Sequence, residues 1–404
     1  DSEDIKNISH DNKQIQFYLN DKLINKKTDN LAFCFFNEKD IVIDKNGGEK
    51  NLDFKINRGA FTKNENASNA FNLILNFEFC QSPHIAEIDQ NLNNKLLNGQ
   101  DFANKIPSDV TKIYFTNKTP QEGVNNIIDF SEAQDGGILG WKDLSDQNIL
   151  YISTCRSNKK VIFNENCDYM FNKEMYKDNG FKIINLYNID FSNVKSTRYM
   201  FSYNKNLTNI NYIENIDVSN VIDMSNMFYM CNSLKYLNIS NWNTCNVTSF
   251  SNTFDSLYGL TNLDVSNLDT SNCTNMFRMF AGLKNVQKLD VSNFDTSKCE
   301  SIYSIFNGCG KIEAIDVSNW DTSNIKDMAF IFSFCKNLKH IDGLENWDVS
   351  NVESLNNTFR VGGGNGSYGI LNLDNISNWN TSNIKDMGFA FYANQFMKTY
   401  NISN

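Results

Sequence analysis

Four aspartates recur every 26 residues, and these residues of the 404-residue sequence are the best placed to do chemistry: Asp264, Asp290, Asp316 and Asp342. Each follows an inward-facing Leu or Ile, so in a strand all four side chains would project outward in one column. Carboxylates stacked about 5 Å apart would attract cations or a basic partner. The plainer interpretation is a solvated acidic face, because at high dielectric each like-charge contact costs only about 1 kcal/mol.

A second column lies two residues earlier in each copy and never holds the same residue twice: Tyr236, Asn262, Lys288, Ala314 and His340. Surface positions that the fold does not constrain can vary to recognise a partner, so this column is a candidate binding site. It is equally consistent with a surface that varies because nothing constrains it. The two columns together give the candidate binding residues Tyr236, Asp264, Lys288, Asp290, Asp316, His340 and Asp342. Tyrosine is an amphipathic anchor, and the carboxylates favour a basic or cation-bridged partner and salt-sensitive association.

Motifs for catalysis, metals and cofactors do not stand out. The histidines His10, His84 and His340 are scattered, and no Cys or His cluster has zinc spacing. No P-loop, G-x-S-x-G or G-x-G-x-x-G context is present, and the glycines at 362–364 lack a following Lys, which indicates a loop. We therefore expect no enzyme activity, no catalytic residues, no metal and no cofactor.

The net charge and the hydropathy argue against two further classes of protein, nucleic-acid-binding proteins and proteins with a membrane span in this sequence. The net charge of −10 argues against nucleic acid, which needs clustered Lys and Arg. No apolar run reaches the roughly 18–20 residues that span a bilayer, so we expect export and anchoring signals to lie outside this sequence. The pattern makes no prediction of oligomeric state.

The element that must position these residues is a repeat. A phenylalanine closes each copy, at Phe171, Phe201, Phe228, Phe254, Phe280, Phe306, Phe332, Phe359 and Phe391. Most of the separations are 26 or 27 residues, a period typical of a solenoid in which each unit buries its face only against its neighbours. The fold class expected is an α+β repeat, a solenoid of about 26-residue coils preceded by a small N-terminal β-rich domain.

Each coil is expected to contain one strand, one bend and one short helix. Parallel strands are predicted at 237–239, 263–265, 289–291 and 315–317, stacked in one sheet. A ladder of inward asparagines is predicted at the bend, at Asn241, Asn267, Asn293, Asn319 and Asn346. The spacing of Val221, Met224, Met227 and Phe228 predicts a short helix with its apolar face inward.

Other repeated residues are interpreted as core. The column Trp242, Leu268, Phe294, Trp320, Trp347 and Trp379 could stack sugars, but its interchange with Leu favours burial. Cys231, Cys245, Cys273, Cys299, Cys309 and Cys335 stand in or beside slots filled elsewhere by Leu, Val or Ile, so we expect unpaired thiols there. A bridge among Cys34, Cys80, Cys155 and Cys167 stays open.

Three segments follow from these patterns. Residues 1–82 predict a small β-rich, sandwich-like domain with strands at 14–19, 31–36, 40–44, 52–56 and 69–80. Residues 83–160 predict a cap with a helix over 85–97, ending at Asn98-Gly99, and strands at 110–115 and 150–154. Residues 161–404 form the repeats.

The phrase L-D-V-S-N-W-D-T-S-N-V-x-x-M-x-x-M-F resembles the BspA-type leucine-rich-repeat surface proteins of bacteria, as do I-L-G-W at 138–141 and V-I-F-N-E-N at 161–166. The likeness covers about 106–404. It implies a right-handed leucine-rich-repeat-like solenoid, exported to the bacterial surface and used for adhesion. Two interruptions, at 341–344 and 361–369, depart from the regular spacing.

The sequence therefore supports two hypotheses about function. The first is a bacterial cell-surface or secreted adhesin that binds a protein or glycan on a host or neighbouring cell. The alternative is a structural spacer or fibre subunit that presents the N-terminal domain, with no binding by the solenoid.

Overall fold

The computed structural model describes residues 8–11, 14–19, 22–23, 92–156, 158–172, 180–360, 369–370 and 373–394. The chain divides into two compact units, Asp1–Phe79 and Cys80–Asn404. In the first unit β1 (Ile8–Asp11), β2 (Gln14–Leu19) and β3 (Lys22–Leu23) pair antiparallel in the order β1-β2-β3. The strand predicted at 14–19 coincides with β2, whereas those at 31–36, 40–44, 52–56 and 69–80 lie outside the described residues.

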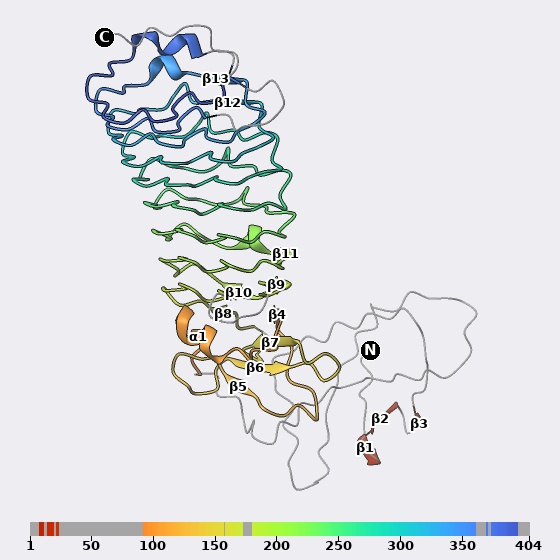
Figure 1. The fold of residues 1–404 in the computed structure, drawn as a ribbon. Coiled ribbons are helices and arrows are strands. Elements are labelled where there is room, and N and C mark those ends of the chain that lie inside the picture. Colours follow the sequence, from red (N-terminus) through yellow and green to blue (C-terminus); the bar gives the residue numbers. More distant parts are fainter. Residues whose placement is uncertain are drawn as a thin grey trace, which may run out of the picture. The chain divides into compact units, whose positions relative to one another are not determined.

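The second unit starts with helix α1 (Gly99–Lys105) and a six-stranded sheet in the order β11-β9-β4-β7-β6-β5. Its strands are β4 (Lys112–Phe115), β5 (Ile128–Asp129), β6 (Leu139–Lys142), β7 (Ile149–Ser153), β9 (Ile183–Asn185) and β11 (Asn209–Asn211). β4 pairs in parallel with both β7 and β9, so the first repeats extend the sheet of the segment before them (Figure 1). The strands predicted at 110–115 and 150–154 correspond to β4 and β7.

The helix predicted over 85–97 is wrong where the structure describes it. Lys95 and Leu96 form β-bridges there, and α1 begins where the predicted helix was to end. Asn98 is the reason, because its side-chain oxygen accepts the N–H of Asp101 at 3.0 Å and caps the start of α1. The Asn-Gly pair is therefore a start signal here.

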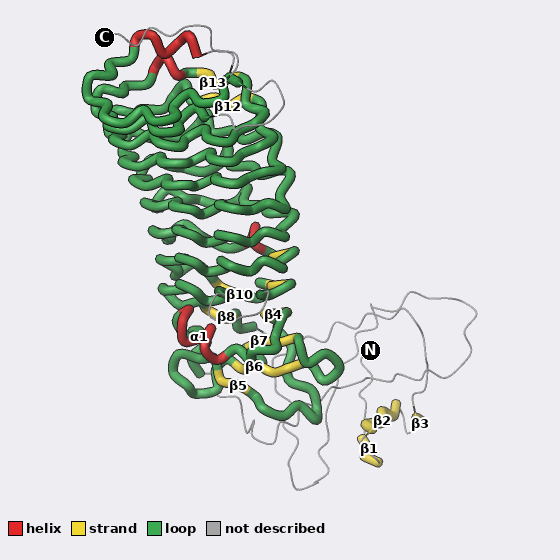
Figure 2. The backbone as a smooth tube through the Cα atoms, viewed as in Figure 1, coloured by secondary structure: helices red, strands yellow, loops and turns green. Residues whose placement is uncertain are grey.

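From β8 (Val161–Ile162) onward, consecutive repeats lie side by side (Figure 1). β8 pairs in parallel with β10 (Ile189–Asp190), and β12 (Ala314–Asp316) with β13 (His340–Asp342). Loops and turns make up most of each repeat (Figure 2), with short 3-10 turns at η2 (Ile213–Asn215), η3 (Leu344–Asn346) and η4 (Leu373–Asn378). The predicted strands at 237–239, 263–265 and 289–291 are not formed, and no backbone hydrogen bond joins these three described segments.

The hydrogen bonds that join consecutive repeats are concentrated around the anchor phenylalanine. Alternate N–H groups, those of Met224, Asn226 and Phe228, donate to carbonyl oxygens of the next repeat at 3.1, 2.7 and 3.1 Å. The N–H groups between them close local turns, as that of Met227 does on the Met224 carbonyl at 3.1 Å. The short helix predicted over 221–228 is therefore wrong, because a helix would turn every N–H group back into its own coil.

Left-handed backbone makes this alternation possible. The residue two positions before every anchor phenylalanine has a φ between 52° and 61°: Tyr169, Tyr199, Asn226, Asn252, Arg278, Ser304, Phe330, Asn357 and Phe389. The residue two positions after it, wherever described, is also left-handed: Tyr203, Met230, Ser256, Gly282, Gly308, Phe334 and Ala393. Each non-glycine residue costs about 1–2 kcal/mol in this region, which the bonds between repeats offset.

The anchor phenylalanines form one continuous stack, as their spacing predicts. Neighbouring ring centroids lie between 5.3 and 6.1 Å apart, and the planes differ by only 3° to 15°. The tryptophan column is buried beside this stack, with Trp320 and Trp347 2% and 4% exposed. Burial confirms the core interpretation and removes the column as a platform for sugars.

The predicted inward asparagine ladder is wrong in its direction. All five asparagines are exposed. Four of them, Asn241, Asn267, Asn319 and Asn346, donate to carbonyl oxygens of the preceding repeat, as Asn319 does to Ser292 at 2.9 Å. Threonines form the buried polar ladder instead, at Thr244, Thr270, Thr296 and Thr322. Interchange with Val at 218 and 349 was the sequence signal, because Val replaces a buried Thr more readily than an exposed one.

The six repeat cysteines are free thiols, as expected. Cys167 is also a free thiol, Cys155 and Cys167 are both buried, and Cys34 and Cys80 lie outside the described residues. Desolvation raises the pKa of Cys273 to about 12 and that of Cys299 to about 11. These thiols therefore stay protonated and unreactive near neutral pH.

Candidate binding face

The four predicted aspartates all lie on the surface, and β12 and β13 fix the register of two of them. Asp316 lies opposite Asp342, and Ala314 lies opposite His340, in a parallel pair. Asp264 and Asp290 are exposed at the matching positions of the two preceding repeats. We call these four residues the acidic column.

Three carboxylates of the acidic column also have a structural role. Oδ1 of Asp264, Asp290 and Asp316 accepts both the N–H and the hydroxyl of the serine two residues later, with hydroxyl distances of 2.7, 2.6 and 2.6 Å. The serine hydroxyl lowers the pKa of Asp264 and of Asp316 below the usual value. The serine bonds therefore fix the orientation of all three carboxylates, and the lowered pKa favours the ionised form of Asp264 and Asp316.

The same bonds leave half of each carboxylate available. The serine contacts of Asp264, Asp290 and Asp316 all end on Oδ1, and no hydrogen bond to their Oδ2 atoms occurs within the described part of the chain. Asp342 is followed by Gly343-Leu344 instead of Val-Ser, so no serine caps it. The column thus presents unshared carboxylate oxygens to solvent.

A second acidic column runs five or six residues later in each repeat, which sequence reasoning missed. Asp269, Asp295, Asp321 and Asp348 are all exposed, and Oδ1 of each accepts the N–H of the serine two residues on. The D-T-S-N phrase and the same 26-residue period were the signal for it. Four consecutive repeats therefore carry eight exposed aspartates, and we call these eight residues the acidic face.

The variable column is exposed throughout, and Tyr236 is its most open member at 66%. Lys288 and His340 are both exposed but lie two repeats apart, so the structure does not bring them together. Tyr187 and Tyr212 follow β9 and β11 at the same ends of the repeats, are 45% and 42% exposed, and have rings 5.5 Å apart. Sequence reasoning missed this tyrosine pair, although each tyrosine follows within two residues of an Asn in the slot of the acidic column.

A second exposed patch lies beside the anchor phenylalanines. The guanidinium of Arg360 is 4.8, 5.8 and 5.4 Å from the ring centroids of Phe334, Phe389 and Tyr392. These rings are 37%, 62% and 52% exposed. Sequence reasoning assigned this side of the repeat to the core, because its left-handed backbone, which turns alternate side chains outward, was not foreseen.

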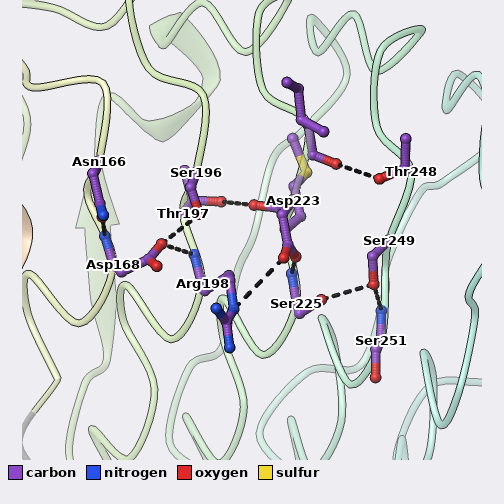
Figure 3. A network of polar contacts seen from close by, with 12 residues as sticks. Asn166, Asp168, Ser196, Thr197, Arg198, Asp223, Ser225, Thr248, Ser249 and Ser251 are labelled. Atoms are coloured by element: carbon purple, nitrogen blue, oxygen red, sulfur yellow. Dashed lines mark hydrogen bonds and ion pairs between the residues drawn. The ribbon is translucent and has the colours of Figure 1, made fainter.

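Polar side chains also join the first repeats to one another (Figure 3). Asp168 accepts the hydroxyl of Ser196 at 2.5 Å, and Arg198 Nε lies 3.5 Å from a carboxylate oxygen of Asp223. Ser225 and Ser249 share a hydroxyl–hydroxyl bond of 2.7 Å. Each of these contacts joins side chains of two consecutive repeats, so the arrangement links the repeats.

No group of three or more His, Cys, Asp or Glu side chains in the described part of the chain is arranged to hold a metal ion. No helix among the described residues has the length and apolar character needed to cross a membrane.

Comparison with known families gives one result. The family model described as "Mycoplasma protein of unknown function, DUF285" matches the chain three times, over residues 165–289, 259–365 and 300–404. The matches overlap, as expected when one repeating unit recurs in tandem, and together they cover the repeats from 165 to 404. Comparisons with curated proteins and with solved structures found no match.

Proposed function

The chain belongs to the DUF285 family of Mycoplasma proteins of unknown function, and from its own surface we propose that it is a binding protein whose acidic face engages a basic partner protein. The observation that carries the proposal is the presence of eight exposed aspartates, in two columns, on four consecutive repeats. Seven of the eight carboxylates, all except that of Asp342, accept hydrogen bonds from a serine on Oδ1, and Oδ2 of Asp264, Asp290 and Asp316 stays open. Fixed, ionised and unshared oxygens lower the ordering cost of charge-assisted contacts.

Tyr187, Tyr212 and Tyr236 supply the apolar part of the contact. They are exposed in three consecutive repeats next to the acidic column, and tyrosine combines a large contact area with a polar hydroxyl. The acidic columns would steer a basic partner, and the tyrosines would anchor it.

The architecture we propose is a right-handed leucine-rich-repeat-like solenoid, similar to the BspA-type surface proteins. The continuous phenylalanine stack and the parallel strand pairs support it. With that resemblance we also propose a location at the bacterial surface or outside the cell, an adhesive role and no enzyme activity. The net charge of −10 supports a protein or glycan partner over nucleic acid.

The test is a binding screen with the full chain against purified surface proteins and glycans. Any binder is then measured against D290K/D316K and against F389A/Y392A, which alters the aromatic patch instead. We expect D290K/D316K to weaken binding at least about tenfold and F389A/Y392A to bind as the wild type does. If D290K/D316K binds as the wild type does, the acidic face is not the binding site, and the partner contacts another part of the protein.

A further inference from the structure

Among the described residues of the repeats, one carboxylate is buried. Asp255 directly follows the anchor Phe254, and its side chain is 0% exposed. The equivalent residues of the other repeats carry no carboxylate: Asn172, Ser202, Tyr229, Ala281, Asn307, Ser333, Arg360 and Tyr392. Burial raises the pKa of Asp255, an effect that Arg278 opposes, so the ionised form depends on a partner.

That partner comes from the next repeat. Arg278 Nε donates to Oδ2 of Asp255 at 2.8 Å, and the Ser256 hydroxyl donates to Oδ1 at 2.8 Å. Arg278 stands two residues before its anchor phenylalanine, where no other repeat has a cation: Tyr169, Tyr199, Asn226, Asn252, Ser304, Phe330, Asn357 and Phe389. Asp255 and Arg278 therefore match only when these two repeats are neighbours.

Apolar packing does not distinguish the correct neighbouring repeat from a wrong one. The repeats at 263–280, 289–306 and 315–332 share the phrase D-V-S-N-x-D-T-S and the same anchor. Any of the three could stack its phenylalanine on Phe254 and extend the threonine ladder. Near-identical units of this kind misassemble during folding, because a wrong neighbour buries almost as much apolar surface as the right one.

A wrong neighbour would leave Asp255 without its cation. If the repeat ending at Phe306 stacked on Phe254, Ser304 would face Asp255, and if the repeat ending at Phe332 did so, Phe330 would. A buried carboxylate that loses its partner is strongly disfavoured, whereas replacing both partners of a buried pair by apolar groups is often neutral. The pair thus discriminates between neighbours more than it stabilises the correct one.

We propose that Asp255 and Arg278 form a register key, which selects the 263–280 repeat as the neighbour of the 237–254 repeat during folding. The key keeps the repeats in sequence order. That order sets the succession of Tyr236, Asn262 and Lys288 on the surface, whatever that surface binds.

The first test compares equilibrium and kinetics in the full chain. D255L/R278M removes both charges, and E165L/K195M removes an exposed pair between repeats, at 2.9 Å, as the matched control. We expect D255L/R278M to keep the wild-type free energy of unfolding but to refold several-fold more slowly, with an added slow phase and a lower native yield. The control should refold as the wild type does. A D255L/R278M protein that refolds with the wild-type rate and yield would overturn the proposal.

The second test moves the key. R278S/S304R places the arginine one repeat later, so the mismatched neighbour becomes the one that satisfies Asp255. During refolding, pulsed hydrogen exchange with mass spectrometry should show a trapped species in which residues 263–288 are unprotected while 289–306 is protected. Simultaneous protection of both segments, as expected for the wild type, would show that the pair does not select neighbours.

Discussion

The hydroxyl of Thr270 accepts the backbone N–H of Asp295 in the next repeat at 2.8 Å and donates to the carbonyl oxygen of the same residue at 3.0 Å. Thr270 is 2% exposed. The equivalent bond recurs from Thr244 to Asp269, from Thr296 to Asp321 and from Thr322 to Asp348, each at 2.9 Å. Thr244 and Thr270 thus satisfy two backbone groups of the next repeat, and Thr296 and Thr322 satisfy one.

Thr270→Val keeps the shape of the side chain and removes both hydrogen bonds. We expect it to lower the free energy of unfolding by about 1–3 kcal/mol, because the backbone groups of Asp295 lose their partner inside the protein. Urea denaturation measures the change, and Thr270→Ser, which keeps the hydroxyl, should retain most of the stability. A loss below about 0.5 kcal/mol for the valine variant would contradict this role.

Gly308 and Gly310 separate backbone conformation from packing. Gly308 has a φ of 76°, and a Cβ there would come no closer than 3.7 Å to any neighbour. Gly310 has the same 3.7 Å clearance without a left-handed φ. Gly308→Ala should therefore cost about 1–2 kcal/mol, whereas Gly310→Ala should be neutral or slightly stabilising. Equal effects of the two variants in thermal denaturation would refute the role of the left-handed turn.

The serine caps predict a dependence of stability on acid. The hydroxyls lower the folded pKa of Asp264 and Asp316 beneath the value of 3.8, so the unfolded chain binds protons first as the pH falls. The contribution is complete above about pH 4 and is lost as the pH falls through the lowered folded values. D264N/D316N keeps the Oδ1 acceptors and removes the titration. Its urea midpoint should fall less than that of the wild type below pH 4, and parallel curves would contradict the prediction.

The stacked cysteines predict a pattern of reactivity. Cys273 and Cys299 are buried with raised pKa values, whereas Cys245 is partly exposed. Native alkylation at pH 8 should modify Cys245 and spare Cys273 and Cys299, and all three should react after denaturation. Mass mapping that recovers a peptide joined through Cys273 and Cys299 would contradict the free-thiol assignment.

The sequence predicts the period and the core well because both depend on side-chain type. The anchor position is phenylalanine in every repeat, and the tryptophan column interchanges only with other apolar residues. The tryptophan column is buried in the structure, and so are the anchor phenylalanines except Phe391, which is partly buried. The outward column of Asp264 to Asp342 follows from simple alternation. Serine caps on that column could also have been read from the D-x-S spacing.

What the sequence does not predict is the backbone between these points. Val221, Met224, Met227 and Phe228 have helical spacing, yet Asn226 and Met230 adopt left-handed conformations that alternate the hydrogen bonds between coils. Residues as different as Tyr169, Arg278 and Phe389 take the same conformation, so no local preference marks it. Hydrogen bonds with the next repeat determine this left-handed conformation, and the sequence of a single repeat does not reveal those bonds. The exposure of Phe389 and Tyr392 follows from the same backbone and was missed with it.

The most direct test of the proposed function uses a partner identified in the binding screen. Its affinity is measured for four forms of the 404-residue chain, each at two salt concentrations. These are the wild type, D290N/D316N, D290K/D316K and F389A/Y392A. The Asn variant keeps the Oδ1 caps and loses only charge, so it should bind more weakly and with less salt dependence. D290K/D316K should lose at least about tenfold in affinity, or about 1.4 kcal/mol, while F389A/Y392A binds as the wild type does. Equal affinities for the wild type and D290K/D316K would contradict binding by the acidic face.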